Sequence, residues 1–83
     1  MTMTIYRKTQ WQCRRGMLEL DVIFHRFFEN QYSLLSTEQK KLFSQLLEQN
    51  DPTLFDWLIT EIDCPDVTLQ PIVQLILKNI SIH

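Results

Sequence analysis

Only one glycine, Gly16, interrupts this chain, and all three prolines lie beyond residue 50. Turn-forming residues are therefore scarce in the first half of the sequence. No segment alternates apolar and polar residues as a half-buried strand does. The apolar residues recur instead at spacings of three and four, which is the pattern of an amphipathic helix. The sequence predicts an all-α fold, a compact bundle of about five short helices.

Two helices are expected on either side of Gly16, one over 5–14 and one over 17–32. Glycine tolerates the left-handed conformation that often ends a helix, so Gly16 is expected to break or bend the chain between them. Farther along, Ser36 and Gln39 have the spacing of a capping box, in which each side chain bonds the other's backbone amide. They predict the start of a third helix.

A fourth helix is expected to begin at Asp51 as its cap, with Pro52 at the first helical position, where a missing amide costs nothing. A fifth is expected over 67–80, and Pro71 is compatible with it only inside the first turn. Residues at helical spacing form the predicted core: Ile23, Phe27, Leu46, Phe55 and Leu58.

Length and composition fit a single domain spanning residues 1–83, with 45% hydrophobic residues, which excludes general disorder. A net charge of −2 argues against nucleic-acid binding, although the basic residues gather before the first acid. No secretion signal is recognisable, and the apolar run over 71–82 is too short to span a bilayer. We therefore expect a cytoplasmic protein with reduced thiols and no direct membrane insertion.

The residues that catalysis requires are poorly represented. His25 and His83 have no cysteine or second histidine at ligand spacing, so no metal site is expected. A chain with one glycine has no phosphate-cradling loop, and no nucleophile motif is present. The sequence predicts neither a catalytic residue nor a cofactor-binding residue, and hence a protein that is not an enzyme.

The segment "CRRGMLELD", residues 13–21, admits two interpretations. In the first it is a helix junction, where Arg15 pairs with Glu19 and Glu19 reaches back to the amide of residue 16. In the second, Arg14, Arg15 and Glu19 project from a bend at which a partner approaches the backbone closely. Nearby, Trp11 lies outside the best apolar stripe. It is either a packing lid over the core or an anchor for a partner.

The stretches "WQCRRGMLELD", "FFENQY" and "LLEQNDPTLFDWL" together resemble the succinate dehydrogenase assembly factors, the SdhE-type flavinylation factors. The resemblance covers roughly residues 7 to 67 and continues more loosely into the last predicted helix. The hallmark of that family is an arginine–glycine pair with a glutamate three residues after the glycine. Arg15, Gly16 and Glu19 match it here.

The resemblance implies a five-helix maturation factor that binds the flavoprotein subunit of succinate dehydrogenase, and often of fumarate reductase. Such a factor promotes covalent attachment of FAD to its client, and FAD belongs to the client rather than to this chain. A free monomer is expected. An antitoxin-like regulatory protein is the alternative. The expected partner-binding residues are Trp11, Arg14, Arg15, Gly16, Glu19 and Asp21.

Overall fold

The computed structural model describes residues 2–81, and side chains over 6–80. The helices are α1 (Thr2–Gln12), α2 (Leu18–Gln31), the short 3₁₀ helix η1 (Tyr32–Leu34), α3 (Thr37–Leu46), α4 (Asp51–Leu58) and α5 (Gln70–Ser81). Within the described part of the chain there is no strand. The prediction of an all-α bundle with five short α-helices is confirmed.

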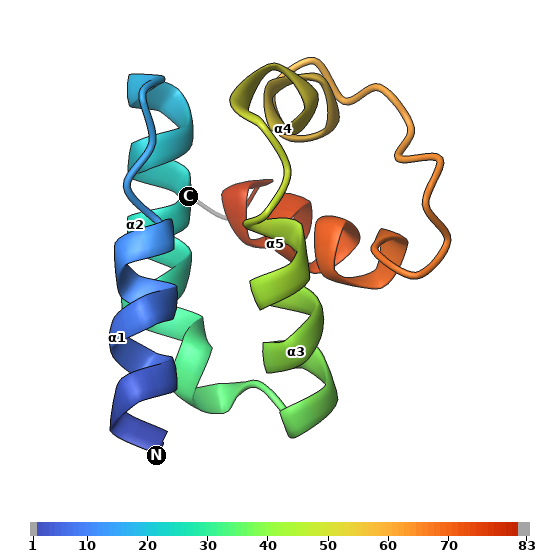
Figure 1. Ribbon diagram of the computed structural model, residues 1–83. Helices are drawn as coiled ribbons and strands as arrows, with labels where there is room; N and C mark the ends of the chain where they lie inside the picture. Colours follow the sequence, from blue (N-terminus) through green and yellow to red (C-terminus); the bar gives the residue numbers. More distant parts are fainter. Residues whose placement is uncertain (1, 82–83) are drawn as a thin grey trace.

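The helices pack around one core. Helices α1 and α2 lie side by side and run in opposite directions (Figure 1), and Tyr6 of α1 contacts Phe28 with ring centroids 4.8 Å apart. Helix α5 packs against α2, α3 and α4. Both the loop from α1 to α2 and the junction from α3 to α4 run through the upper half of Figure 1.

Helix α1 ends earlier than the sequence predicted. The amide of Cys13 bonds the carbonyls of both Thr9 and Gln10 at 3.2 Å, and the amide of Arg14 bonds the carbonyl of Trp11 at 3.0 Å. The last turn therefore tightens from i→i−4 to i→i−3 bonds, and the chain leaves the helix before it reaches Gly16. The glycine does not end α1.

The capping-box prediction at α3 is confirmed, because the Gln39 amide donates to Ser36 Oγ at 3.1 Å and the Ser36 amide donates to Gln39 Oε1 at 2.9 Å. The prediction that Asp51 caps α4 is wrong. Asn50 is the N-cap, and its Oδ1 accepts from the Thr53 amide at 3.0 Å. The carboxylate of Asp51 has other partners in the loop between α1 and α2.

Helix α5 begins at Gln70, three residues later than expected, and Pro71 lies in its first turn as predicted. Asp66 explains the delay. Its carboxylate accepts from the Thr68 amide at 2.9 Å, and its carbonyl accepts from the Leu69 and Gln70 amides. This turn occupies residues 67–69, so the helix starts only after it.

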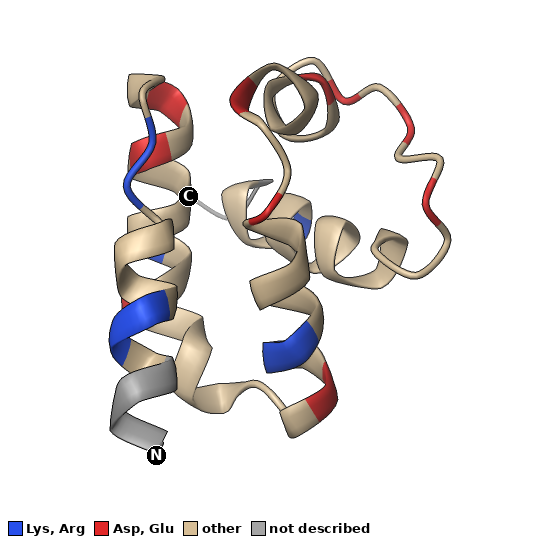
Figure 2. Ribbon diagram, viewed as in Figure 1, with Lys and Arg blue, Asp and Glu red and all other residues tan. Residues whose placement is uncertain are grey.

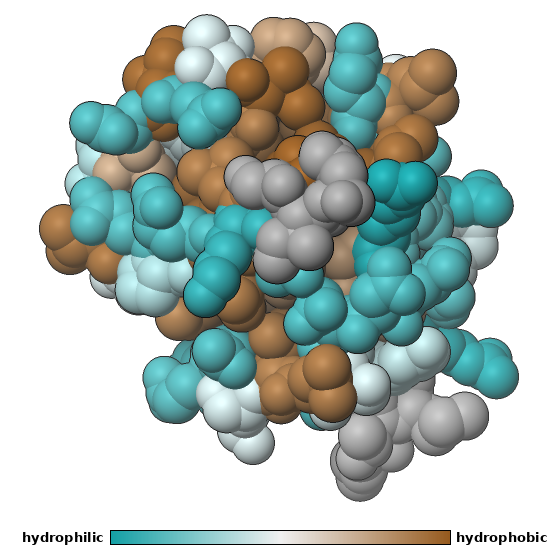
Figure 3. All heavy atoms as spheres, turned by 180° about the vertical axis from the view of Figure 1, so that it is seen from behind, coloured by the Kyte–Doolittle hydropathy of each residue, from teal (hydrophilic) through white to brown (hydrophobic). Residues whose placement is uncertain are grey.

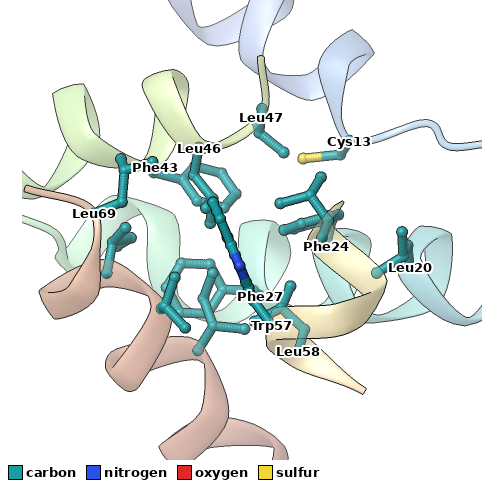
Figure 4. Close-up of a cluster of buried hydrophobic side chains, with 14 of the residues drawn as sticks. Cys13, Leu20, Phe24, Phe27, Phe43, Leu46, Leu47, Trp57, Leu58 and Leu69 are labelled. Carbon is teal, nitrogen blue, oxygen red and sulfur yellow. The ribbon is translucent and has the colours of Figure 1, made fainter. Parts of the chain in front are cut away.

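Figure 4 shows the core, with side chains converging from all parts of the bundle. Of the predicted core residues, Phe27, Leu46 and Leu58 are buried, whereas Ile23 and Phe55 are half-buried against the cluster. Trp57, which the sequence did not single out, is only 7% exposed and lies among these side chains. The largest fully buried side chains include Leu20, Phe24, Phe43, Leu54, Ile72 and Ile76.

Candidate functional site

Residues 13–17 connect α1 to α2 and form what we call the α1–α2 loop. Buried residues flank the exposed part of the loop, because Cys13 at its start and Leu20 in the first turn of α2 are both fully buried. Between these anchors the chain returns to the surface, where Arg14 and Gly16 are exposed. The sequence thus places a short exposed turn between two buried anchors, and the predicted site residues lie on it or next to it.

Arg15 is the most highly bonded residue of the loop. Its Nε donates to Asp51 Oδ1 at 2.8 Å, and its Nη1 donates to the carbonyls of Gln12 and Leu47 at 2.9 and 3.0 Å. Its Nη2 donates to the carbonyl of Gln49 at 2.7 Å. The side chain is only 11% exposed. The guanidinium therefore points into the protein and ties the loop to the α3–α4 junction.

Asp51 completes this connection from the first turn of α4. Its Oδ1 accepts from Arg15, and its Oδ2 accepts from the amides of Gly16 and Met17 at 3.0 and 3.3 Å. Burial acts to raise the pKa of this carboxyl, but the hydrogen bond and charge of Arg15 and the two amides outweigh it. The pKa of Asp51 is therefore lowered. We call Arg15 and Asp51 the clamp.

The helix-junction interpretation of residues 13–21 was wrong in its partners. Arg15 pairs with Asp51 rather than with Glu19, and the amide of Gly16 bonds Asp51 rather than Glu19. Glu19 is exposed in the first turn of α2, and its side chain makes no hydrogen bond or ion pair with any residue over 6–80. Asp21, in the first turn of α2, bonds the loop, since its Oδ1 accepts from the Arg15 amide at 3.1 Å.

Gly16 does not adopt the left-handed conformation that the sequence led us to expect, because its φ is not positive. A Cβ built on it would lie 3.5 Å from Asp51 Oδ2, which is an ordinary van der Waals contact. Neither the backbone conformation nor the space inside the protein therefore requires glycine at this exposed position. The packing of the described residues thus gives no reason for glycine rather than alanine at this position.

Exposed apolar groups surround the loop. Trp11 is 68% exposed, and the Arg14 guanidinium carbon lies 5.0 Å from its ring centroid, in a cation–π contact. This exposure favours the partner-anchor interpretation of Trp11 over that of a packing lid. Leu18, at the start of α2, is 73% exposed. Its exposure could have been predicted, because Leu18 lies outside the apolar stripe of that helix.

The loop borders a shallow open depression lined by Arg14, Arg15, Gly16, Leu18, Asp21 and His25. His25 Nδ1 lies 2.8 Å from the carbonyl of Asp21 and 3.5 Å from its Oδ1. The structure thus brings together four of the six predicted residues, with Trp11 beneath Arg14, whereas Glu19 does not line this depression. Asp51 and His25 were missed as members of the site.

Charge is distributed unevenly around this site (Figure 2). Lysine and arginine residues lie on α1 and the α1–α2 loop, whereas all charged residues of α4 and of the segment after it are acidic. No lysine or arginine occurs over 42–77. On the reverse face, apolar side chains form patches between polar ones (Figure 3). A groove between α2 and α5 is lined by apolar residues that include Val22, Ile23, Ile76 and Ile80.

Other kinds of chemistry find little support in the part of the chain that the structure describes. Cys13 and Cys64 are free and buried, and burial raises the pKa of the Cys13 thiol to about 12. No group of metal-ligating side chains comes together among these residues, and His83 lies outside them. None of the described helices combines the length and the apolar character that a membrane crossing requires.

Comparison with known proteins gives consistent matches. A family model described as "Flavinator of succinate dehydrogenase" matches residues 7–80. A Colwellia psychrerythraea protein named "FAD assembly factor SdhE" is 45% identical over 75 residues, which is 90% of this chain and 82% of that protein. Proteins of the same name from Shewanella oneidensis and Coxiella burnetii are 53% and 51% identical. Those alignments cover 75% and 64% of this chain, and 76% and 65% of the relatives.

Proposed function

Because this chain belongs to the family of succinate dehydrogenase flavinators, we propose that it is a maturation factor for the flavoprotein subunit of that enzyme. It binds the subunit and promotes covalent attachment of FAD to it. The family match over residues 7–80 is the observation that carries this proposal. The flavoprotein subunit of fumarate reductase is a second proposed client, to which FAD would be attached in the same way.

The geometry of the α1–α2 loop supports binding at this place. Gly16 is exposed and has no internal reason to lack a side chain, as expected where the backbone of a partner approaches closely. Glu19 is exposed and unpaired among the described residues, so its carboxylate is free to accept charge-assisted hydrogen bonds from the client. Trp11 and Arg14 are residue types favoured at interface hot spots, and both are exposed.

The role of the factor is to orient the client rather than to catalyse. A protein that holds the client's reacting side chain and the flavin in reacting geometry can lower the barrier by several kcal/mol without chemistry of its own. The site offers few groups for chemistry, which supports this role. The Arg15 guanidinium donates hydrogen bonds to acceptors within the protein, and the Cys13 thiol is buried and protonated. FAD is held by the client, and the factor acts as a monomer in the cytoplasm.

The experiment uses purified flavoprotein subunit of succinate dehydrogenase without covalent flavin, mixed with FAD in the presence and absence of this protein. Covalent flavin is measured as fluorescence of the subunit band on a denaturing gel. We expect the band to brighten faster with the factor present, and Glu19→Ala to reduce that effect. Equal rates with and without the factor contradict the proposal. The subunit of fumarate reductase, assayed in parallel, tests the second client.

A further inference from the structure

One carboxylate holds the α1–α2 loop to the body of the protein. Asp51 accepts hydrogen bonds from N–H groups of three loop residues, Arg15, Gly16 and Met17. These residues lie 34 to 36 positions before it in the sequence. Both of its oxygens are used, Oδ1 by a side chain and Oδ2 by two backbone amides. The shape of the loop therefore depends on a residue that lies outside the family's hallmark motif.

Arg15 has little bonding capacity left for a partner. Its four internal hydrogen bonds occupy all but one of the guanidinium N–H donors. The side chain is 11% exposed, and the guanidinium carbon also lies 5.9 Å from the ring centroid of buried Phe24. Bidentate hydrogen bonding of Arg15 to a client carboxylate needs two free N–H donors, so at least one of these internal hydrogen bonds would have to break. The side chain is thus committed to the fold of the loop.

We propose that Asp51 is a positioning residue for client binding, and that Arg15 acts on the client through this clamp rather than by touching it. The clamp fixes the loop in the conformation that exposes Gly16 and leads into the turn of α2 carrying Glu19. This inference rests on the proposed function, and it adds to that function a residue and a role within the same site. Glycine and glutamate make the contact, and the clamp holds them in place.

The chemistry of the clamp requires a carboxylate. Every group that faces Asp51 is an N–H donor, so both oxygens must accept. Asparagine has the same shape but only one acceptor oxygen. In Asp51→Asn, the new NH₂ group faces either Arg15 Nε or the amides of Gly16 and Met17, donor against donor. Asp56 provides a matched control, because it is exposed on the same helix and its side chain bonds none of the residues over 6–80.

The first measurement is the dissociation constant of each full-length variant for the flavoprotein subunit of succinate dehydrogenase, under conditions where circular dichroism shows the variant folded. The second is amide hydrogen exchange at Gly16 and Met17 by NMR. We expect Asp51→Asn to weaken client binding by about tenfold or more, because a loop that is no longer held must be ordered on binding. Exchange at both amides should accelerate, and Asp56→Asn should change neither quantity.

A control separates this role from stability alone. Val73→Ala removes a buried side chain from α5, a helix that contributes neither residue of the clamp. We expect it to bind the client as the wild type does while the protein remains folded. Binding by Asp51→Asn equal to that of the wild type overturns the inference, as does unchanged exchange at Gly16 and Met17. If Asp51→Asn does not fold, Asp51→Ser, which removes the charge and one of the two acceptor oxygens, takes its place in each measurement.

A double-mutant cycle tests the role of Arg15. If Arg15 acts only through Asp51, the variant carrying both Arg15→Ala and Asp51→Asn binds about as weakly as the weaker single variant. If the two losses multiply instead, Arg15 and Asp51 act on binding independently rather than as one clamp, and the inference is overturned. Failure of the wild type itself to bind or to promote flavinylation contradicts the proposed function and the inference together. A functional wild type with a fully functional Asp51→Asn contradicts the inference alone.

Discussion

Replacing Gly16 with alanine places a methyl group 3.5 Å from Asp51 Oδ2, in ordinary contact, on a backbone whose φ is not positive. Alanine can adopt this conformation without strain, so it should lower the entropy of the unfolded chain at no cost to the folded state. We expect the free energy of unfolding to rise by about 0.4–1 kcal/mol. Binding of the client should nevertheless weaken. A methyl group forced into a close-packed contact typically costs about 1–3 kcal/mol, or roughly 5- to 150-fold in affinity.

Stability is measured by urea denaturation followed by tryptophan fluorescence, which reports on buried Trp57, and affinity by titration of the flavoprotein subunit. Gly16→Arg extends the series: it should remain folded but abolish covalent flavin attachment, because its long side chain holds the two surfaces apart. Gln74→Arg, at an exposed position on α5, controls for the added charge. A folded Gly16→Arg protein that supports full flavinylation would refute the reasoning and leave residues 13–21 as a plain helix junction.

Three further measurements test the fold and the clamp. Phe27→Ala should lower the free energy of unfolding by about 3–5 kcal/mol, since the ring is 3% exposed, whereas exposed Glu19→Ala should cost less than about 1 kcal/mol; equal losses on denaturation would make Glu19 structural. Because the pKa of Asp51 is lowered in the folded state, its contribution to stability is complete above the unfolded pKa and is lost as the pH falls through the folded pKa. The stability difference between the wild type and Asp51→Asn should therefore be constant above about pH 5 and shrink in more acidic solution; a difference that grows on acidification contradicts this. The Cys13 thiol, whose pKa is about 12, should resist a thiol-specific reagent at about pH 8 until urea unfolds the protein, and rapid labelling in native buffer would show that it is not buried.

The helices could be predicted from the sequence because their evidence is local. Apolar residues at helical spacing and the Ser36 capping box depend on neighbours within four positions, and the structure confirms both. The ends of the helices were less predictable, because neighbouring turns compete with the helix for the same backbone groups. The bonds to Asp66 delay α5, and the tightened last turn at Cys13 stops α1 before Gly16. How deeply a single residue such as Phe55 is buried depends on tertiary packing that no local pattern specifies.

The role of Asp51 was beyond local prediction for a different reason. Aspartate before a proline at a helix start is a good cap, so its type was already explained without a distant partner. Asn50 beside it is equally able to cap, and the structure assigns the cap to Asn50. Two adjacent residues that can each cap one helix leave one of them free for another purpose. Here the residue that does not cap the helix is Asp51, which bonds Arg15. The arginine of the motif therefore shapes the loop, whereas the glycine and the glutamate of the motif remain exposed.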